Sequence, residues 1–318
     1  MINIVLSSDD SYIPYCSTTM LSIVSNNDAC SFYIISEHLN EDSKQKLLEI
    51  AKQNGSSATF ITIPPKLLDT LPMPKSKAVS HISLATYYRL FIADLLPQDV
   101  DKVLYLDCDI LVRKSLVELW NTPLDDFALG AVYQINSEAN ERCYALGISV
   151  MYGYFNAGVL LINLQYWRQH NCSAKFLLFI KQQFERIFYH DQDILNAVLF
   201  DKTKRLSCKW NMTTNLFRNS VYYINEKDKK GNIVRKNEDY KKTIRQEVKD
   251  PAIIHFVTSL KPWNPRCFHP WKREYIAFFK KAGYCYEESK KYTLLFYIVK
   301  IARILKLDLL KDKLNGFS

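Results

Sequence analysis

The stretch that decides the fold reads Lys102-Val-Leu-Tyr-Leu-Asp107-Cys108-Asp109-Ile-Leu-Val112. The run before Asp107 is largely apolar and predicts a buried strand, which two carboxylates follow directly. In open α/β sheets, ligands bind beyond the carboxyl ends of the strands. Carboxylate oxygens suit Mg²⁺ or Mn²⁺, and such a cation can stabilise a diphosphate as it leaves. A bare D-x-D pattern is also typical of a loop that caps the next element.

The sequence before this stretch alternates strand-like and helix-like segments. Apolar runs at residues 2–7, 31–36 and 58–63 predict strands, and residues 12–24 and 40–54 have the spacing of helices. This alternation predicts an α/β fold, with a mostly parallel sheet and helices on both faces. No G-x-G-x-x-G pattern follows the first strand, so we expect no NAD-type dinucleotide site.

The sequence after this stretch continues the α/β pattern. Strands are predicted at 128–133, 159–163 and 253–257, helices at 83–95 and 191–200, and a loop or hairpin at 225–250. We therefore predict a catalytic domain over residues 1–265 and a basic, helical C-terminal region over residues 266–318.

The composition indicates a globular intracellular protein. The chain has 318 residues, 48% of them hydrophobic, which is enough to bury one large core. Its start lacks a basic leader followed by a long apolar run, so we expect no signal peptide and a cytoplasmic location. The 8 cysteines form no C-x-x-C pair and are expected to be reduced. Glycines and asparagines interrupt the uncharged stretch 143–167, which argues against a membrane span.

The C-terminal region carries most of the excess positive charge. Residues 266–318 hold a net charge of +7, out of +9 for the whole chain. Within residues 290–311 one helical face is apolar, formed by Leu294, Ile298, Ile301, Leu305 and Leu309. A basic amphipathic helix is suited to an anionic membrane surface. The alternative is a helix packed on the catalytic domain. No nucleic-acid-binding motif accompanies the basic residues, so we expect no nucleic-acid partner.

Six motifs in the chain resemble glycosyltransferase family 8, with the bacterial lipopolysaccharide galactosyl- and glucosyltransferases as the closest branch. In order they are Ser8-Asp9-Asp10-Ser11-Tyr12, Tyr87-Tyr88-Arg89-Leu90, Leu104-Tyr105-Leu106-Asp107-Cys108-Asp109, Phe155-Asn156-Ala157-Gly158-Val159-Leu160-Leu161-Ile162-Asn163, His190-Asp191-Gln192-Asp193-Ile194-Leu195-Asn196, and His255-Phe256 with Lys261-Pro262-Trp263. The resemblance implies a GT-A fold, a Mn²⁺-dependent UDP-sugar donor and retention of the anomeric configuration.

The resemblance also implies a metal site. Asp107 and Asp109 resemble the metal carboxylates, and His255 resembles the third protein ligand. An imidazole with two carboxylates suits Mn²⁺, with Mg²⁺ as the alternative. Because His255 must be neutral to bind a cation, we expect activity to fall at acid pH.

Five residues resemble the donor-binding positions of the family. Asp9 resembles the residue that contacts the uracil ring, and Asp10 lies beside it; the alternative for both is a solvated acidic turn. Arg89 resembles the residue that meets the donor sugar and phosphates, and it could instead form a salt bridge on a helix surface. Asn156 and Ala157 resemble a sugar- and ribose-contacting pair, although Asn156 could also form a turn.

The segment Asp191-Gln192-Asp193 resembles the catalytic region of the family. Both aspartates would accept hydrogen bonds from sugar hydroxyls, with helix capping as the alternative. Gln192 stands where a nucleophile would be sought, but an amide is a poor one, unlike the carboxylates of retaining glycosidases. We therefore favour a front-face reaction, in which the acceptor hydroxyl attacks on the side from which UDP leaves and Gln192 stabilises the developing positive charge.

The last motif contains a match and a departure. Lys261 resembles the residue that reaches the diphosphate, with a solvated loop lysine as the alternative. Thr258 stands where many relatives have glycine, in an H-x-x-G-x-x-K-P-W pattern. A glycine backbone approaches a phosphate closely, whereas Thr258 would have to use its hydroxyl. Cys108 is expected to be a small core residue.

Together these observations predict a retaining hexosyltransferase. The donor would be UDP-galactose or UDP-glucose, and the acceptor a lipid-linked saccharide of a lipopolysaccharide, lipooligosaccharide or related surface glycan. Such an enzyme would lie on the inner face of the cytoplasmic membrane. One alternative is a non-catalytic nucleotide-sugar binding module with a GT-A fold, and another is a nucleic-acid enzyme that uses the paired acids.

Overall fold

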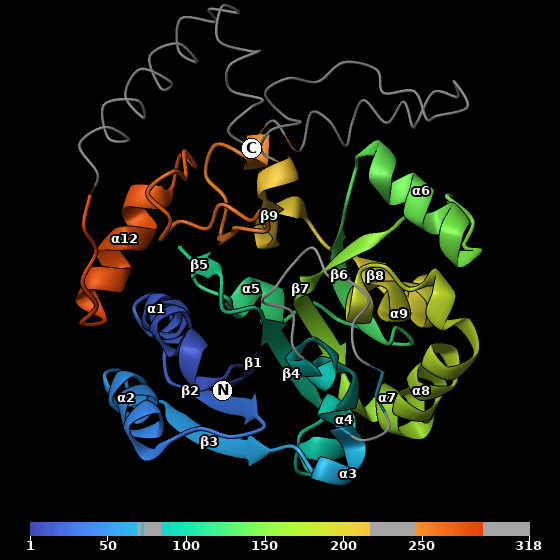
Figure 1. Cartoon of the computed structure of the whole chain (residues 1–318), viewed down its shortest axis with the longest axis horizontal. Coiled ribbons are helices and arrows are strands. Elements are labelled where there is room, and N and C mark those ends of the chain that lie inside the picture. Colours follow the sequence, from blue (N-terminus) through green and yellow to red (C-terminus); the bar gives the residue numbers. More distant parts are fainter. Residues whose placement is uncertain (69–70, 73–83, 217–243, 245, 289–318) are drawn as a thin grey trace, which may run out of the picture.

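The computed structural model describes residues 1–68, 71–72, 84–216, 244 and 246–288 (Figure 1). Among these residues the main sheet has the strand order β3-β2-β1-β4-β7-β6-β8. Its strands are β1 (Ile2–Ser7), β2 (Cys30–Ser36), β3 (Ser57–Thr62), β4 (Lys102–Leu106), β6 (Leu129–Tyr133), β7 (Phe155–Asn163) and β8 (Thr203–Arg205).

The sheet is mostly parallel, and one strand, β7, runs against its neighbours. Strands β3, β2, β1 and β4 run parallel to one another, whereas β7 is antiparallel to both β4 and β6. β8 again pairs in parallel with β6. The predicted mixed, mostly parallel sheet with flanking helices is confirmed.

Helices cover both faces of this sheet (Figure 1). On one face lie α1 (Ile13–Val24) and α2 (Glu41–Lys52). The other face is covered by the 3₁₀ helix η2 (Leu84–Phe91) and by α4 (Ile92–Leu95), α7 (Leu164–Gln169), α8 (Cys172–Gln183) and α9 (His190–Leu199). Apart from α12, described below, the other helical segments in the described residues are α3 (Pro65–Leu68), α5 (Val117–Trp120), α6 (Ser137–Leu146), η1 (Asp10–Tyr12), η3 (Phe184–Arg186), η4 (Phe200–Lys202) and η5 (Cys208–Trp210).

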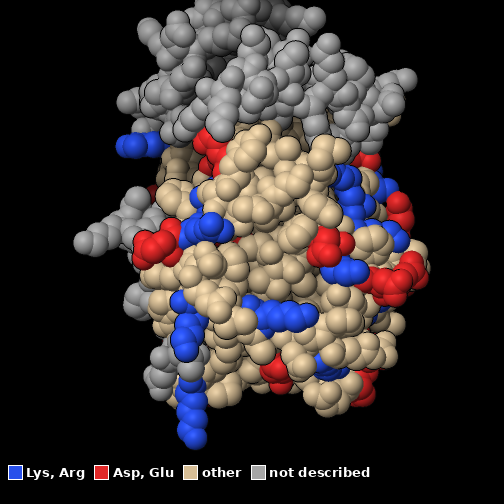
Figure 2. All heavy atoms as spheres, turned by 90° about the vertical axis from the view of Figure 1, so that its right-hand side faces the viewer, with Lys and Arg blue, Asp and Glu red and all other residues tan. Residues whose placement is uncertain are grey.

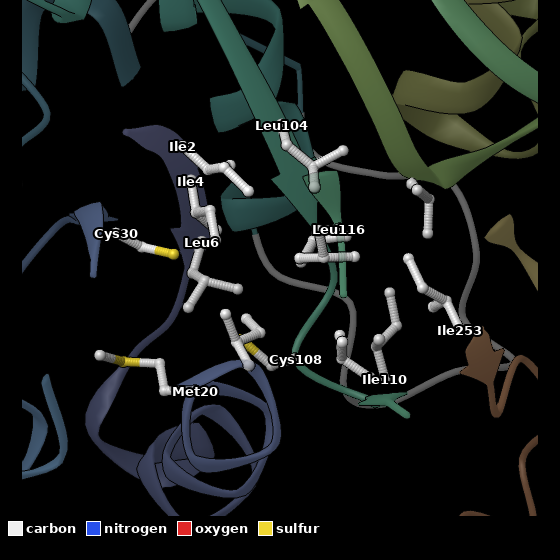
Figure 3. Close-up of a cluster of buried hydrophobic side chains, with 14 of the residues drawn as sticks. Ile2, Ile4, Leu6, Met20, Cys30, Leu104, Cys108, Ile110, Leu116 and Ile253 are labelled. Atoms are coloured by element: carbon white, nitrogen blue, oxygen red, sulfur yellow. The ribbon is translucent and has the colours of Figure 1, made fainter. Parts of the chain in front are cut away.

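The alternation of side chains in the central strands supplies two cores. In β4, Leu104 and Leu106 belong to the core under α1, while Val103 and Tyr105 belong to the opposite core. Figure 3 shows the first of these cores, with Cys108 among the apolar side chains beside α1. Cys108 is 5% exposed, so its predicted place in the core is confirmed.

A small second sheet, in the order β5-β10-β9, closes the carboxyl end of β4. It consists of β5 (Ile110–Val112), β9 (Met212–Thr213) and β10 (Ile253–His255). Helix α12 (Lys272–Lys281) packs Tyr275, Ile276 and Phe279 against apolar residues of this sheet and of the segment that follows it. The described part of the C-terminal region thus packs on the α/β core.

One element, the strand β7, differs from the sequence prediction. β7 begins at Phe155, not at 159, so Asn156 lies in a strand and the turn alternative for it is wrong. The helix predicted at 83–95 is confirmed from residue 84 on, as the 3₁₀ helix η2 followed directly by α4. Tyr87 and Leu90, and likewise Tyr88 and Phe91, are three residues apart and all buried, a spacing at which 3₁₀ side chains eclipse.

The membrane-related predictions have different outcomes. Among the described residues, no helix combines the length and apolarity that a bilayer crossing requires. The uncharged stretch 143–167 forms the end of α6, the strand β7 and the start of α7. The predicted amphipathic helix at 290–311, and most of the predicted loop at 225–250, lie outside the described residues.

Candidate active site

Three elements bring a histidine to the acidic pair that follows β4. Asp107 and Asp109 lie between β4 and β5, and His255 ends β10. β10 pairs antiparallel with β5 in a register that places His255 opposite Ile110, beside Asp109. One ligand atom from each of the three side chains lies within 4.8 Å of the others. The structure therefore assembles the cluster that the sequence predicted.

The hydrogen bonding of His255 leaves a lone pair for a cation. Its Nδ1 lies 3.0 Å from Oδ1 of Asn211, an acceptor, so the neutral ring carries its proton on Nδ1. Its Nε2 lies 3.5 Å from Oδ2 of Asp107 and 3.2 Å from Oδ1 of Asp109. That Asp109 oxygen is buried without a hydrogen-bond donor. The lone pairs of Nε2 and of the two carboxylate oxygens face one another, so the three residues fit a divalent cation. A proton on Nε2 would compete with that cation.

The other oxygen of Asp109 is neutralised by Lys261. The ammonium lies 2.5 Å from Oδ2 of Asp109 and also donates to the carbonyl of Phe256. Burial alone would raise the pKa of Asp109, but the nearby positive charge, that of Lys261 above all, lowers it below the usual value. Lys261 is therefore not a solvated loop lysine: it shares Asp109 with the candidate metal position.

A glycine of β7 makes room for the imidazole. A Cβ on Gly158 would lie 2.1 Å from Cε1 of His255 and 2.7 Å from Oδ2 of Asp107. Neither distance is compatible with any side chain at this position. Gly158 belongs to one of the six motifs, and its small size in an otherwise bulky strand was the sequence signal for this role.

Arg89 links the acidic pair to the segment that starts α9. Its guanidinium lies 2.9 Å from Asp107 and 2.8 Å from Asp191, and it donates to the carbonyl of Ala157 at 2.7 Å. The ring of Tyr105 lies under it, 4.3 Å away. With a side chain only 11% exposed, Arg89 does not form the surface salt bridge of the alternative.

Asp191 is a buried acid held by this arginine. It is 5% exposed, and it accepts hydrogen bonds from Thr86 as well as pairing with Arg89. Burial raises the pKa of Asp191 to about 6, and Arg89 opposes the rise only in part. Just before it, His190 has a φ of 46°, a left-handed conformation that is uncommon for a residue other than glycine.

Asp193 makes the capping contacts that the sequence analysis kept as the alternative. Its Oδ2 accepts from the backbone N–H groups of Phe188 and Tyr189, and Arg142 and Tyr154 also donate to the carboxylate. Asp193 is fully buried. All of its contacts are therefore within the protein.

Asn156, Ala157 and Gln192 form one hydrogen-bonded group. Oε1 of Gln192 accepts from Nδ2 of Asn156 and from the backbone N–H of Ala157. Asn156 is 8% exposed and Ala157 is 2% exposed. The group is anchored on β7, directly beside Gly158.

Three predicted residues remain: Asp9, which caps the 3₁₀ helix η1, Asp10, which begins it, and Thr258 in a loop. Asp9 accepts from the backbone N–H of Tyr12, the last residue of η1, and Asp10 accepts from that of Asn40. Both aspartates are exposed, in an acidic turn at the end of β1. Thr258 is half-buried, and its hydroxyl is 3.5 Å from the carbonyl of Leu260. Their roles toward the donor stay predictions.

An aromatic cluster holds the loop that carries Lys261. Trp263 stacks on Tyr15 of α1 with ring centroids 3.6 Å apart, and Tyr12 meets Trp263 edge-on. Burial and the nearby Asp109 carboxylate raise the pKa of Tyr12 to about 12. Tyr12 therefore stays a neutral hydroxyl beside the cluster; it ends the first of the six motifs, but its contact with Trp263 was not predictable from the motif.

Residues 3–267 match the family model described as glycosyl transferase family 8. The chain belongs to this family. The matched segment includes Asp107, Asp109 and His255 together with the arginine and glutamine that surround them. The expected family and enzyme class are thereby confirmed: the protein is a glycosyltransferase.

Relatives and solved structures agree with this membership. The family 8 chain is 30% identical to General stress protein A of Bacillus subtilis (strain 168), with 87% of this chain and 92% of that protein covered. It is 27% identical to lipopolysaccharide 1,2-glucosyltransferase of Escherichia coli (strain K12), with 86% and 76% covered. The crystal structure of galactosyltransferase LgtC with donor and acceptor sugar analogs has a TM-score of 0.76 at 26% identity, with 90% and 98% covered. The GT-A fold is confirmed.

Proposed function

We propose that this glycosyltransferase is a retaining hexosyltransferase. It moves galactose or glucose from a UDP-sugar to a lipopolysaccharide, lipooligosaccharide or related surface-glycan acceptor, with Mn²⁺ as its cofactor. Two similar proteins support the choice of sugars, since one is named a glucosyltransferase and the other a galactosyltransferase. The observation that carries the proposal is the cluster of Asp107, Asp109 and His255, whose ligand atoms lie within 4.8 Å of one another.

The three side chains would hold the cation. An imidazole nitrogen among carboxylate oxygens favours Mn²⁺ over Mg²⁺, which prefers oxygen ligands and retains its waters. When bound, the cation supplies Lewis-acid stabilisation of the charge on the departing diphosphate. Lys261 adds a fixed positive charge at the edge of this site, 2.5 Å from Asp109.

The buried arginine would keep the acids in place while the donor binds. Arg89 pairs with Asp107 on one side and with Asp191 on the other, so it ties the metal site to the start of α9. Asp9 and Asp10 at the end of β1 are the proposed contacts for the uracil ring. Asn156 and Ala157 on β7 are proposed to border the sugar and ribose.

A front-face reaction agrees with the state of Gln192. Its Oε1 already accepts two hydrogen bonds, from Asn156 and from the backbone of Ala157, which leaves a poor nucleophile. In the proposed step the bond from the sugar C1 to the diphosphate oxygen breaks, and C1 bonds to the acceptor oxygen on the same face. The acceptor proton passes to the departing diphosphate.

A donor screen tests this proposal. UDP release is measured with UDP-galactose and UDP-glucose, with Mn²⁺ and with a chelator. We expect Mn²⁺-dependent release from one of the two sugars, its loss in Asp109→Asn, and no loss in a control at the exposed Asp28, Asp28→Asn. Proton NMR of the product anomer tests retention. Release that persists unchanged in chelator would contradict the metal role.

The non-catalytic alternative makes a different prediction. A binding module would hold UDP tightly, yet no UDP-sugar would break down with any saccharide acceptor supplied. Thr258, in place of the family's glycine, motivates this alternative, because a side chain there limits the approach of a diphosphate to the backbone. Thr258→Gly separates the two: in an enzyme limited by this residue, UDP release should rise.

We also propose a cytoplasmic location at the inner face of the membrane. The support is the basic amphipathic sequence at 290–311, which lies outside the described residues. On the face shown in Figure 2, by contrast, basic and acidic side chains are interspersed. Sedimentation with anionic and neutral vesicles tests the proposal. We expect binding to anionic vesicles by the full chain only, and equal binding by a chain that ends at residue 288 would contradict it.

A further inference from the structure

A continuous chain of hydrogen bonds runs from His255 into the core of the protein. It links side chains of β10, the segment before β9, β7 and α9, in the order His255, Asn211, Asn156, Gln192, Tyr154 and Asp193. Each of its links is between 2.7 and 3.0 Å long. From this chain we infer that Asn211 is a positioning residue, which fixes the ring of His255 with its Nε2 lone pair toward the two acids. The inference rests on the proposed cation site.

The direction of the chain is set by groups that can act in only one way. The backbone N–H of Gly158 donates to Oδ1 of Asn156 at 3.0 Å, and the backbone N–H of Ala157 donates to Oε1 of Gln192 at 3.1 Å. These two N–H groups determine which end of each amide is oxygen. At the far end the carboxylate of Asp193 accepts from Arg142 and from two backbone N–H groups, so Tyr154 also donates to it and accepts from Gln192.

This direction carries over to the histidine. Because Oδ1 of Asn156 is an acceptor, Asn211 must turn its Nδ2 toward it, at 2.8 Å. The oxygen of Asn211 then faces Nδ1 of His255, which must carry the proton. In the neutral ring the lone pair then lies on Nε2, 3.2 Å from the donor-free oxygen of Asp109. If the amide of Asn211 were flipped, its Nδ2 would face the protonated Nδ1 of His255, and its Oδ1 would face Oδ1 of Asn156. Both contacts would then lack a hydrogen bond.

Burial makes this arrangement hard to replace with water. Asn211 and Asp193 are fully buried, Tyr154 is 1% exposed and His255 is 2% exposed. An unsatisfied polar group in such surroundings is strongly unfavourable, so the amides are held in one orientation. Arg142, 2.6 Å from Asp193, neutralises the charge at the inner end. The same chain of hydrogen bonds joins His255 to Gln192, so one network positions both the candidate metal ligand and the proposed catalytic residue.

Two measurements test the inference. The first is long-range ¹H–¹⁵N NMR of the metal-free full chain at alkaline pH, which distinguishes protonated from unprotonated ring nitrogens. We expect His255 to carry its proton on Nδ1, and a proton on Nε2 would overturn the inference. This measurement uses the wild type, so it does not depend on whether any variant folds.

The second measurement is Mn²⁺ affinity, by calorimetry, in Asn211→Leu. We expect a fall of about 10–100-fold, the usual cost of losing a group that orients a metal ligand. Asn196→Leu is the matched control, because Asn196 is also fully buried and bonds only to backbone groups, those of Phe155 and Gln192, and not to the side chain of Asn211 or His255. It should lower stability and leave Mn²⁺ affinity unchanged.

The outcomes separate this inference from the proposed function. Wild-type affinity in Asn211→Leu would overturn the positioning role while leaving the cation site intact. A wild type that binds no Mn²⁺ would overturn the proposed function instead, and the tautomer measurement would still report on Asn211.

Discussion

Replacing Gly158 by alanine tests the geometry of the cation site with one methyl group. The added Cβ would lie 2.1 Å from Cε1 of His255, where carbon atoms prefer about 3.5–4.0 Å. The ring must therefore move by more than about 1 Å, whereas metal–ligand distances tolerate about 0.2 Å. We expect Mn²⁺ affinity to fall about 100-fold or more. Overpacking should also lower the free energy of unfolding by about 1–3 kcal/mol.

The assay combines Mn²⁺ titration by electron paramagnetic resonance with chemical unfolding. Gly130→Ala is the matched control, because Gly130 lies in the neighbouring strand β6 and a Cβ there would meet only the side chain of Leu206, at 3.1 Å. That side chain can shift, so Mn²⁺ affinity should be unchanged. Neither glycine has a positive φ, so both substitutions test space rather than backbone strain.

A double-mutant cycle locates the clash. In a His255→Ala background most of the collision is gone, so adding Gly158→Ala should cost less unfolding free energy than it does in the wild type. Wild-type Mn²⁺ affinity in the single variant Gly158→Ala would refute the reasoning, since the methyl group could then be accommodated without moving the imidazole.

Three further predictions concern the surrounding residues. Because burial raises the pKa of Asp191 from 3.8 to about 6, its stabilising contribution is full below the lower value and is lost as pH rises through the upper one. Between pH 4 and 7 the metal-free wild type should lose about 2–3 kcal/mol more unfolding free energy than Asp191→Asn; equal losses would contradict the shift. Lys261→Met should raise the KM for the UDP-sugar more than it lowers kcat, as steady-state kinetics will show. Trp263→Ala should lower the unfolding free energy by about 1 kcal/mol or more through the lost stacking on Tyr15. Chemical unfolding measures this loss, and Trp120→Ala serves as the comparison for removing a tryptophan side chain.

Much of the fold follows from local sequence. The apolar runs of β1, β2 and β4 are strands because every second side chain enters one of two cores, and Asn40 caps α2 where the helical spacing begins. The members of the candidate metal cluster, Asp107, Asp109 and His255, were predictable because each belongs to a motif that resembles the family. The distance between Asp109 and His255 was not, since it depends on the pairing of β5 with β10 across a long stretch of chain.

The hydrogen-bond partners of the site side chains could not be predicted from the sequence. Asp193 was expected to meet a sugar, yet it accepts bonds from Arg142, Tyr154 and the start of its own helix. Asn156 was open to interpretation as a turn former because asparagine favours turns, but two amides and a backbone N–H satisfy it within β7. These contacts form only when distant segments meet, so local propensity carries no record of them.

The central claim is that His255 binds a cation together with Asp107 and Asp109. Pulsed electron paramagnetic resonance of the Mn²⁺-loaded protein tests it most directly, because a bound imidazole couples its ¹⁴N nucleus to the manganese electrons. We predict a ¹⁴N coupling in the wild type and its loss in His255→Ala. A wild-type spectrum with no nitrogen coupling, or a coupling that persists in His255→Ala, would contradict the account.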